Sequence, residues 1–127
     1  MTTSTRSTSA ASSKAHRDTV SESVASITNF LVDLLGSRLT ARLAGVDTSS
    51  ISRWKSGAAT PQEDSEHRLR AAHQVARLLL AVDADHTVRA WFIGMNPQLD
   101  DEAPIDAIAA GDIKAVLAAA RSFIDGA

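Results

Sequence analysis

Residue types that could carry catalysis or bind a metal ion occur in the sequence, but not at the spacings that such chemistry requires. The chain has no Cys, which excludes a thiolate nucleophile, a disulfide scaffold and a Cys-based zinc site. His67 and His73 would fall on different faces of a helix, so they form no metal-binding pair. Asp83, Asp85 and His86 precede an expected helix start, which favours capping over a hard-cation site. No GxSxG elbow or phosphate-binding glycine loop is present. We therefore predict no catalytic residue, no metal and no cofactor.

The composition favours an all-α protein. Aromatic residues make up 4% of the 127 residues, Tyr is absent, and no alternating strand pattern of useful length occurs. No window is apolar enough to span a membrane, and the Ser/Thr-rich start lacks the apolar stretch of a signal peptide, so we expect a cytoplasmic protein. We expect three regions, namely a disordered Ser/Thr-rich tail (1–18), a helical domain (19–64) and a C-terminal helical domain (65–127).

Apolar residues at helical spacing predict the individual elements. A first helix should begin at Val20, capped by Asp18 or Thr19, and end at Gly36. Prolines should open two short helices, with Asn96 capping the first of them. Glycines should end helices in the left-handed conformation, at Gly36, Gly57, Gly94, Gly111 and Gly126. The later helices are expected at 37–44, 48–56, 65–82, 87–93, 104–110 and from Ile113 onward, with Asp112 as the last cap.

The segment from Ser37 to Gly57 has the order of two short helices joined by a tight turn. Gly45 supplies the turn, Asp47 caps the second helix, and Ala41 is a small residue where the helices cross. The seam between the helices should bury Thr40, Ala44, Val46, Ile51 and Trp54. This arrangement resembles the helix-turn-helix of the Xre and phage-repressor class, whose second helix enters the major groove of DNA.

The resemblance assigns the exposed residues of this segment to DNA. Arg53 is the strongest candidate base reader, because its guanidinium can contact guanine O6 and N7 together. Thr48, Ser49 and Ser52 share its face, and the residues placed for phosphates are Ser37, Arg38, Arg42 and Lys55. Short Ser and Thr readers imply modest specificity at each half-site, which favours binding as a dimer.

A second pattern covers the C-terminal part of the chain. It consists of Trp91, Asn96-Pro97-x-Leu99, Pro104-Ile105 with Ile108, and Gly111-Asp112 followed by an apolar helix. Together with the preceding helix-turn-helix, this order resembles the Xre/MbcA/ParS antitoxins over about residues 20 to 125. Members of that family usually have a glycine in the loop before the second proline, where this chain has Asp100-Asp101-Glu102-Ala103.

The resemblance implies an antitoxin of a type II toxin–antitoxin module that represses its own operon. It also implies a RES-domain toxin that degrades NAD as the partner, and neutralisation by occlusion of the NAD site. The assembly would be a homodimer or a larger toxin–antitoxin hetero-oligomer. The residues expected to contact the toxin are Trp91, Asn96, Asp100, Asp101, Glu102, Lys114, Arg121, Phe123, Ile124 and Asp125. Of these, the four in the last helix that are expected to occupy the mouth of the toxin's active site are Arg121, Phe123, Ile124 and Asp125.

The charge distribution agrees with two different partners. Residues 1–60 carry seven basic and four acidic side chains, a net +3, whereas residues 61–127 carry six and eleven, a net −5. An acidic surface is complementary to the basic cleft expected of a protein that binds an anionic dinucleotide. One alternative is a stand-alone Xre-type regulator whose C-terminal helices only dimerise it. An enzyme that uses the Asp83–His86 loop is disfavoured, because no catalytic constellation accompanies it.

Overall fold

Helices account for all the regular secondary structure in the residues that the computed structural model describes, 22–126. This confirms the predicted all-α class. The predicted tail and the predicted caps Asp18 and Thr19 lie outside the described residues. The helices are α2 (Val24–Leu35), α3 (Ser37–Ala44), α4 (Thr48–Ser56), α5 (Glu63–Leu80), α6 (Asp85–Ile93), the 3₁₀ turn η1 (Pro97–Leu99), α7 (Pro104–Ala109) and α8 (Ile113–Gly126).

Side-chain caps fix several of the helix starts. Ser23 has an extended backbone and accepts a hydrogen bond from the N–H of Ser26, so this helix begins at Val24 and not, as predicted, at Val20. Asp47 caps α4 and Asn96 caps η1, as predicted. The bounds predicted for the helices at 37–44 and 48–56 are confirmed.

Four bounds predicted for the later helices and one predicted role are wrong. Helix α5 begins at Glu63 rather than Ser65, because the N–H of Glu66 already bonds to the carbonyl of Gln62, and it ends before Val82. Helix α6 begins two residues early, at Asp85, and α7 ends one residue early, at Ala109. Ala84, not an acidic residue, occupies the N-cap of α6, so the loop acid Asp85 lies in the first turn, where its charge favours the helix dipole.

Two of the five predicted left-handed helix ends are also wrong. Gly57 is left-handed, with φ 79°, and Gly36 and Gly111 have positive φ as well. Gly94 is extended, with φ −83°, and a Cβ added there would lie 3.2 Å from the carbonyl oxygen of Ala90. Gly126 lies within α8. The structure thus uses three of these positions for turns that other residues adopt only at a cost.

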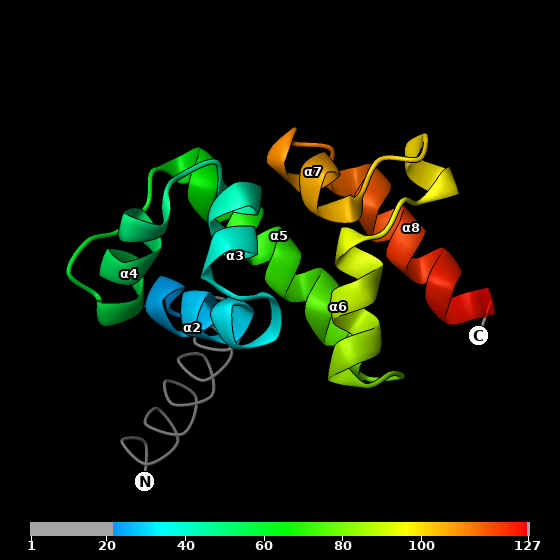
Figure 1. The fold of residues 1–127 in the computed structure, drawn as a ribbon, viewed down its shortest axis with the longest axis horizontal. Coiled ribbons are helices and arrows are strands. Elements are labelled where there is room, and N and C mark those ends of the chain that lie inside the picture. Colours follow the sequence, from blue (N-terminus) through cyan, green and yellow to red (C-terminus); the bar gives the residue numbers. More distant parts are fainter. Residues whose placement is uncertain (1–21, 127) are drawn as a thin grey trace, which may run out of the picture.

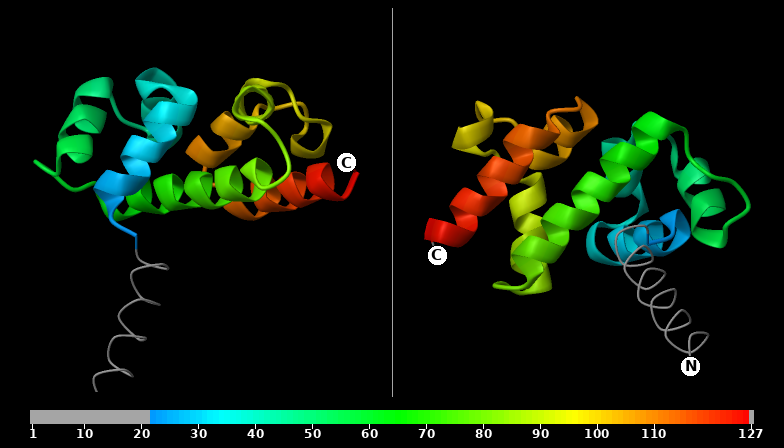
Figure 2. Two further views of the ribbon diagram at one scale, coloured as in Figure 1. Left: turned by 90° about the horizontal axis from the view of Figure 1, so that it is seen from below. Right: turned by 180° about the vertical axis from the view of Figure 1, so that it is seen from behind.

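Helix α5 runs through the middle of the molecule. It packs against α2 and α3 on one side of its length and against α6, α7 and α8 on the other (Figure 1). Figure 2 shows α4, α3 and α6 on one side of α5. The buried apolar side chains form a single cluster that includes Leu31, Ile51, Leu69, Phe92 and Ile108. None of the helices in the described residues has the length and hydropathy needed to cross a membrane.

Candidate functional site

Helix α4 presents the predicted base-reading residues to solvent. Ile51 and Trp54 are buried and fix the helix against α2. The amide of Asn29 adds a bond to the carbonyl of Lys55, 3.1 Å long. The opposite face of α4 is therefore free, and it exposes Thr48, Ser49, Ser52, Arg53 and Lys55.

The capping network of α4 restrains two members of this face. The hydroxyl of Ser49 donates to Asp47 over 2.8 Å, and the guanidinium of Arg53 donates to the hydroxyl of Ser50 over 3.3 Å. The backbone N–H of Ser50, then the hydroxyls of Ser49 and Ser50, lower the pKa of Asp47. Asp47 is charged at neutral pH, and its carboxylate acts as the N-cap of α4. Of the predicted seam residues, Val46 is half-buried, and the others are buried.

The residues predicted to contact phosphates are divided between α3 and α4. Ser37, Arg38 and Arg42 lie along α3, and Arg42 makes a two-pronged ion pair with Asp106 of α7. The Nε–Oδ1 distance is 2.7 Å and the Nη2–Oδ2 distance is 3.0 Å. No sequence pattern indicated this pair, because its partners are 64 positions apart.

An aromatic pair joins α6 and α8 on the predicted partner-binding side. Trp91 and Phe123 are both half-buried, and their ring centroids are 6.5 Å apart. Ile124, which follows Phe123 in the chain, is half-buried, while Arg121 and Asp125 are exposed. The structure therefore brings together Trp91 and the end of α8. Lys114 lies at the opposite end of α8, nine residues or about 14 Å along the helix axis from Phe123.

Asn96 and the acidic loop play a structural role that the sequence did not reveal in full. The side chain of Asn96 accepts from the N–H of Gln98, and its backbone carbonyl accepts from Leu99 and Asp101. Asp100 and Asp101 have φ of 55° and 66°, in the left-handed region. The acidic residues thus occupy the conformation that glycine adopts readily, and Asp100, Asp101 and Glu102 are exposed.

Sequence reasoning missed two apolar residues next to this loop. Ile93 is 48% exposed and Met95 is 81% exposed, and they lie two and four positions after Trp91 in the chain. Their apolar character was visible in the sequence, but Ile93 is the last residue of α6 and Met95 lies in the following loop, where helical periodicity does not indicate exposure. An exposed group of large apolar side chains is a common mark of a protein-binding surface.

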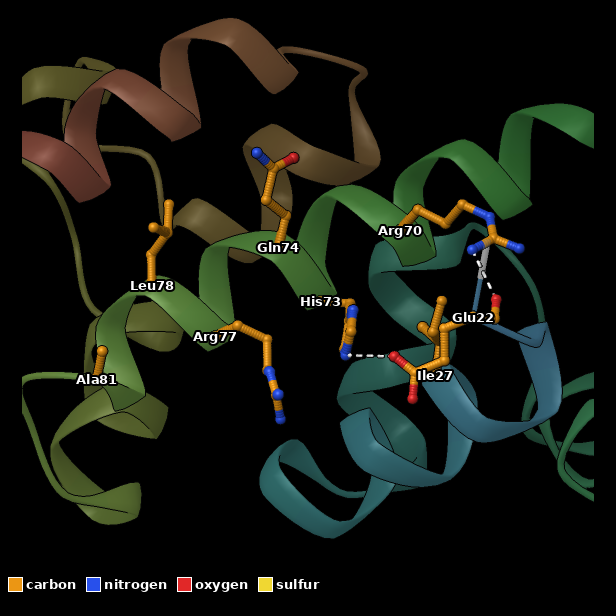
Figure 3. A pocket seen from close by; sticks show the side chains of 8 residues that line it. All are labelled: Glu22, Ile27, Arg70, His73, Gln74, Arg77, Leu78 and Ala81. Carbon is orange, nitrogen blue, oxygen red and sulfur yellow. Dashed lines mark hydrogen bonds and ion pairs between the residues drawn. The ribbon is translucent and has the colours of Figure 1, made fainter. Parts of the chain in front are cut away.

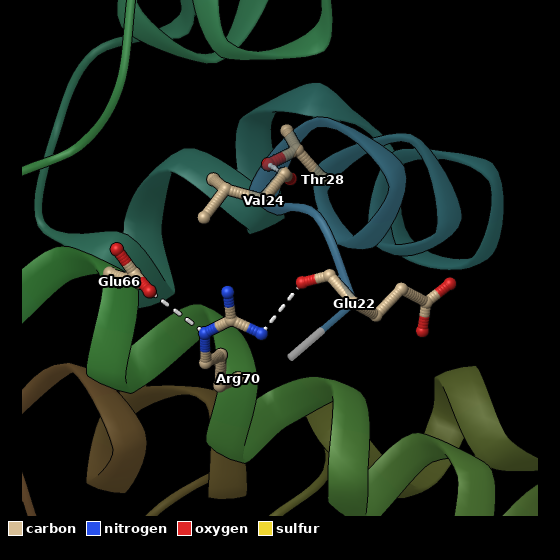
Figure 4. Close-up of polar contacts among 5 residues, drawn as sticks. All are labelled: Glu22, Val24, Thr28, Glu66 and Arg70. Atoms are coloured by element: carbon tan, nitrogen blue, oxygen red, sulfur yellow. Dashed lines mark hydrogen bonds and ion pairs between the residues drawn. The ribbon is translucent and has the colours of Figure 1, made fainter. Parts of the chain in front are cut away.

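A separate cavity of about 570 Å³ lies between α2 and α5 (Figure 3). His73 lies 3.5 Å from a carboxylate oxygen of Glu22, and its ring contacts Phe30 edge-on. Burial lowers the pKa of His73, against the opposing effect of Glu22. Arg70 bonds to the carbonyl of Glu22 and the carboxylate of Glu66 (Figure 4), which ties the start of α2 to α5.

The described residues contain no cluster of three or more His, Asp or Glu side chains that could hold a metal ion. Among residues 22–126, no buried side-chain nitrogen or oxygen lacks a hydrogen-bond partner. The polar groups of the interior are thus satisfied by the fold itself. The chemically informative features of this part of the chain lie on its surface.

The architecture is that of a small helical protein whose two ends carry different exposed surfaces, one polar and basic, the other aromatic and acidic. No family model matches the sequence, and no curated protein matches it. One solved structure does, the crystal structure of the M. tuberculosis MbcT–MbcA toxin–antitoxin complex, with a TM-score of 0.69 and 25% sequence identity. The match covers 80% of this chain and 94% of the other. The chain thus has the fold of an MbcA-type antitoxin, which confirms the resemblance stated from the sequence.

Proposed function

We propose that this chain is an antitoxin that binds a toxin of the RES class and occludes its NAD-degrading site. It has no catalytic activity of its own, acts in the cytoplasm, and binds its own operator through α3 and α4. The observation that carries the proposal is the similarity to a toxin–antitoxin complex over 80% of the chain.

The surface at the end of α8 supports the toxin-binding part. Trp91 and Phe123 form a half-buried aromatic pair, and Ile93 and Met95, two and four positions after Trp91, expose apolar side chains to solvent. Aromatic and Met side chains are enriched in the centres of protein interfaces. The acidic residues Asp100, Asp101, Glu102 and Asp125 are exposed, and they supply charge complementary to a cleft that binds an anionic dinucleotide.

The helices α3 and α4 support the DNA-binding part. Two helices of eight and nine residues meet through a three-residue turn, and the second helix exposes a continuous polar face with Arg53 and Lys55. That geometry matches a helix-turn-helix whose second helix reads the major groove. The division of the chain at residue 64 and a dimeric or larger assembly remain predictions of the same proposal.

Co-expression with the product of the neighbouring reading frame tests the main function. We expect the chain to restore growth of cells in which that product is toxic. We also expect the purified chain to stop the degradation of NAD by the purified product. The double variant Arg121→Ala/Asp125→Ala removes two exposed side chains from the end of α8 without touching the core. We expect it to weaken toxin affinity by roughly 1–3 kcal/mol, or about 5- to 150-fold.

Gln74→Ala is the matched control, because Gln74 is exposed on α5 in the separate cavity between α2 and α5. It should leave toxin affinity unchanged. A double variant that binds and protects as well as the wild type would exclude the end of α8 from the interface. If the wild-type chain binds DNA but does not neutralise the product of the neighbouring reading frame, the result favours the alternative function, a stand-alone transcriptional regulator.

A further inference from the structure

Three arginines line one open pocket between α3 and α6. The pocket has a volume of about 620 Å³, and its walls come from the α2–α3 junction, α3 and α6. Arg38 and Arg42 belong to the predicted DNA-contacting helix, but Arg89 belongs to α6, in the region assigned to the toxin. The lining residues are Leu35, Gly36, Ser37, Arg38, Leu39, Arg42 and Arg89.

The pocket keeps a positive charge after its one ion pair is counted. Within residues 22–126, Arg42 pairs with Asp106, and neither Arg38 nor Arg89 takes part in a salt bridge. Asp106 bonds to Nε and Nη2 of Arg42 and holds its guanidinium in place. The Nη1 donors are left for a further acceptor, and the side chain of Arg42 is 61% exposed.

The start of α3 adds backbone N–H donors to the wall of this pocket. Helix α3 starts at Ser37, and its cap residue Gly36 offers no side-chain hydrogen bond. The first intrahelical bond runs from the N–H of Thr40 to the carbonyl of Gly36. A Cβ added to Gly36 would meet no atom within 4 Å, so this edge of the backbone is open to a ligand. Arginine forks and free amides together favour an oxyanion.

The position of the pocket favours a phosphate of duplex DNA over an enclosed small molecule. Arg38, Arg42 and Arg89 are all exposed, so the pocket is a surface feature. Helices α4, α3 and α6 lie on the same side of α5 (Figure 2), which allows one duplex to contact all three. Phosphate contacts from elements flanking the recognition helix fix its register on DNA.

We propose that this pocket binds a backbone phosphate of the operator, with Arg89 of α6 as a DNA contact beyond the helix-turn-helix. The inference rests on the DNA-binding part of the proposed function. It extends the DNA footprint onto the C-terminal region. Since α6 also carries Trp91, the same helix contributes to both proposed partner surfaces.

The test measures binding of the full chain to a duplex from upstream of its own gene, and to an unrelated duplex, by fluorescence anisotropy at 50–200 mM salt. The toxin partner is added in a parallel series. We expect Arg89→Ala to weaken binding to both duplexes alike, by about three- to tenfold at the lowest salt. The slope of log affinity against log salt should become shallower by about 0.9, the value for one lost phosphate contact.

Arg77→Ala is the matched control, because it removes the same charge from an exposed side chain that packs over Phe30 in the α2–α5 cavity. It should leave both affinity and slope at wild-type values. An Arg89→Ala chain with wild-type affinity and slope would overturn the inference, and so would an equal loss in Arg77→Ala, which would mark a general charge effect.

Two further outcomes separate the sources of failure. A titration with inorganic phosphate, followed through the arginine side-chain NMR signals, shows whether the pocket binds free phosphate. If the pocket binds free phosphate but Arg89→Ala has the DNA affinity of the wild type, the proposed DNA contact is overturned. A wild-type chain that binds neither duplex, with or without toxin, would remove the DNA-binding part of the proposed function and this inference with it, while neutralisation would stand.

Discussion

Two aspartates take a strained backbone conformation in the loop at 100–103, where the antitoxins that this chain resembles usually have a glycine. Asp100 and Asp101 both adopt positive φ directly after η1. The left-handed conformation costs an ordinary L-residue roughly 1–2 kcal/mol, and Asp tolerates it better than most. The loop is held by hydrogen bonds to Asn96, including one from the N–H of Asp101 to its carbonyl, 2.9 Å long.

Asp101→Gly should therefore stabilise the chain. We expect the free energy of unfolding to rise by about 0.5–1 kcal/mol, because glycine adopts φ 66° without a steric cost, although it loses more backbone freedom on folding. Urea unfolding measures the change. Asp101→Asn is the control, since it removes the charge but keeps a side chain that tolerates this conformation, and its stability should stay near that of the wild type. A less stable glycine variant would show that the carboxylate itself holds the loop.

Pairs of elements carry contacts that no local pattern predicts. Periodicity and caps were sufficient for α3 and α4, because Gly45 and Asp47 mark their ends unambiguously. They were insufficient at α5 and α6, where the starts at Glu63 and Asp85 have no side-chain cap hydrogen bond. The exposed faces of α4 and α8 followed from periodicity. The Arg42–Asp106 pair and the basic pocket did not, because they depend on how distant helices pack.

The contact between α5 and the segment before α2 gives a pH prediction. Burial lowers the pKa of His73 below its ordinary value of 6.5, and the charge of Glu22 opposes this only partly. The folded chain thus binds the proton less readily than the unfolded chain. The free energy of unfolding should fall as the pH drops below about 6.5, and level off once the pH passes below the lowered pKa.

Comparison of wild type with His73→Gln isolates this contribution. Urea unfolding at pH 8 and at pH 5.5 should show a smaller acid-induced loss of stability in the variant, whatever the variant's stability at pH 8. The opposite result, a larger acid-induced loss in the variant, would mean that the ion pair with Glu22 outweighs the burial of His73.

At the scale of the whole molecule, residues 22–126 share one apolar core although they carry two proposed partner surfaces. Helix α5 packs against α2 and α3 as well as against α6, α7 and α8, and the buried side chains of all these helices form one cluster. Helix α3 also packs directly against α7, and the Arg42–Asp106 pair bridges them at the surface. A shared core means that neither half buries its apolar face without the other.

The chain should consequently unfold in a single cooperative transition. Its two tryptophans report on the two halves, since Trp54 is buried in α4 and Trp91 is half-buried in α6. In the single-tryptophan variants Trp91→Phe and Trp54→Phe, each fluorescence transition should share its urea midpoint with the loss of helical circular dichroism of the same variant. Two separate midpoints within one variant would show that the halves fold independently, and the division at residue 64 would then be structural. A single midpoint would mean that binding at one surface and stability at the other are coupled through α5.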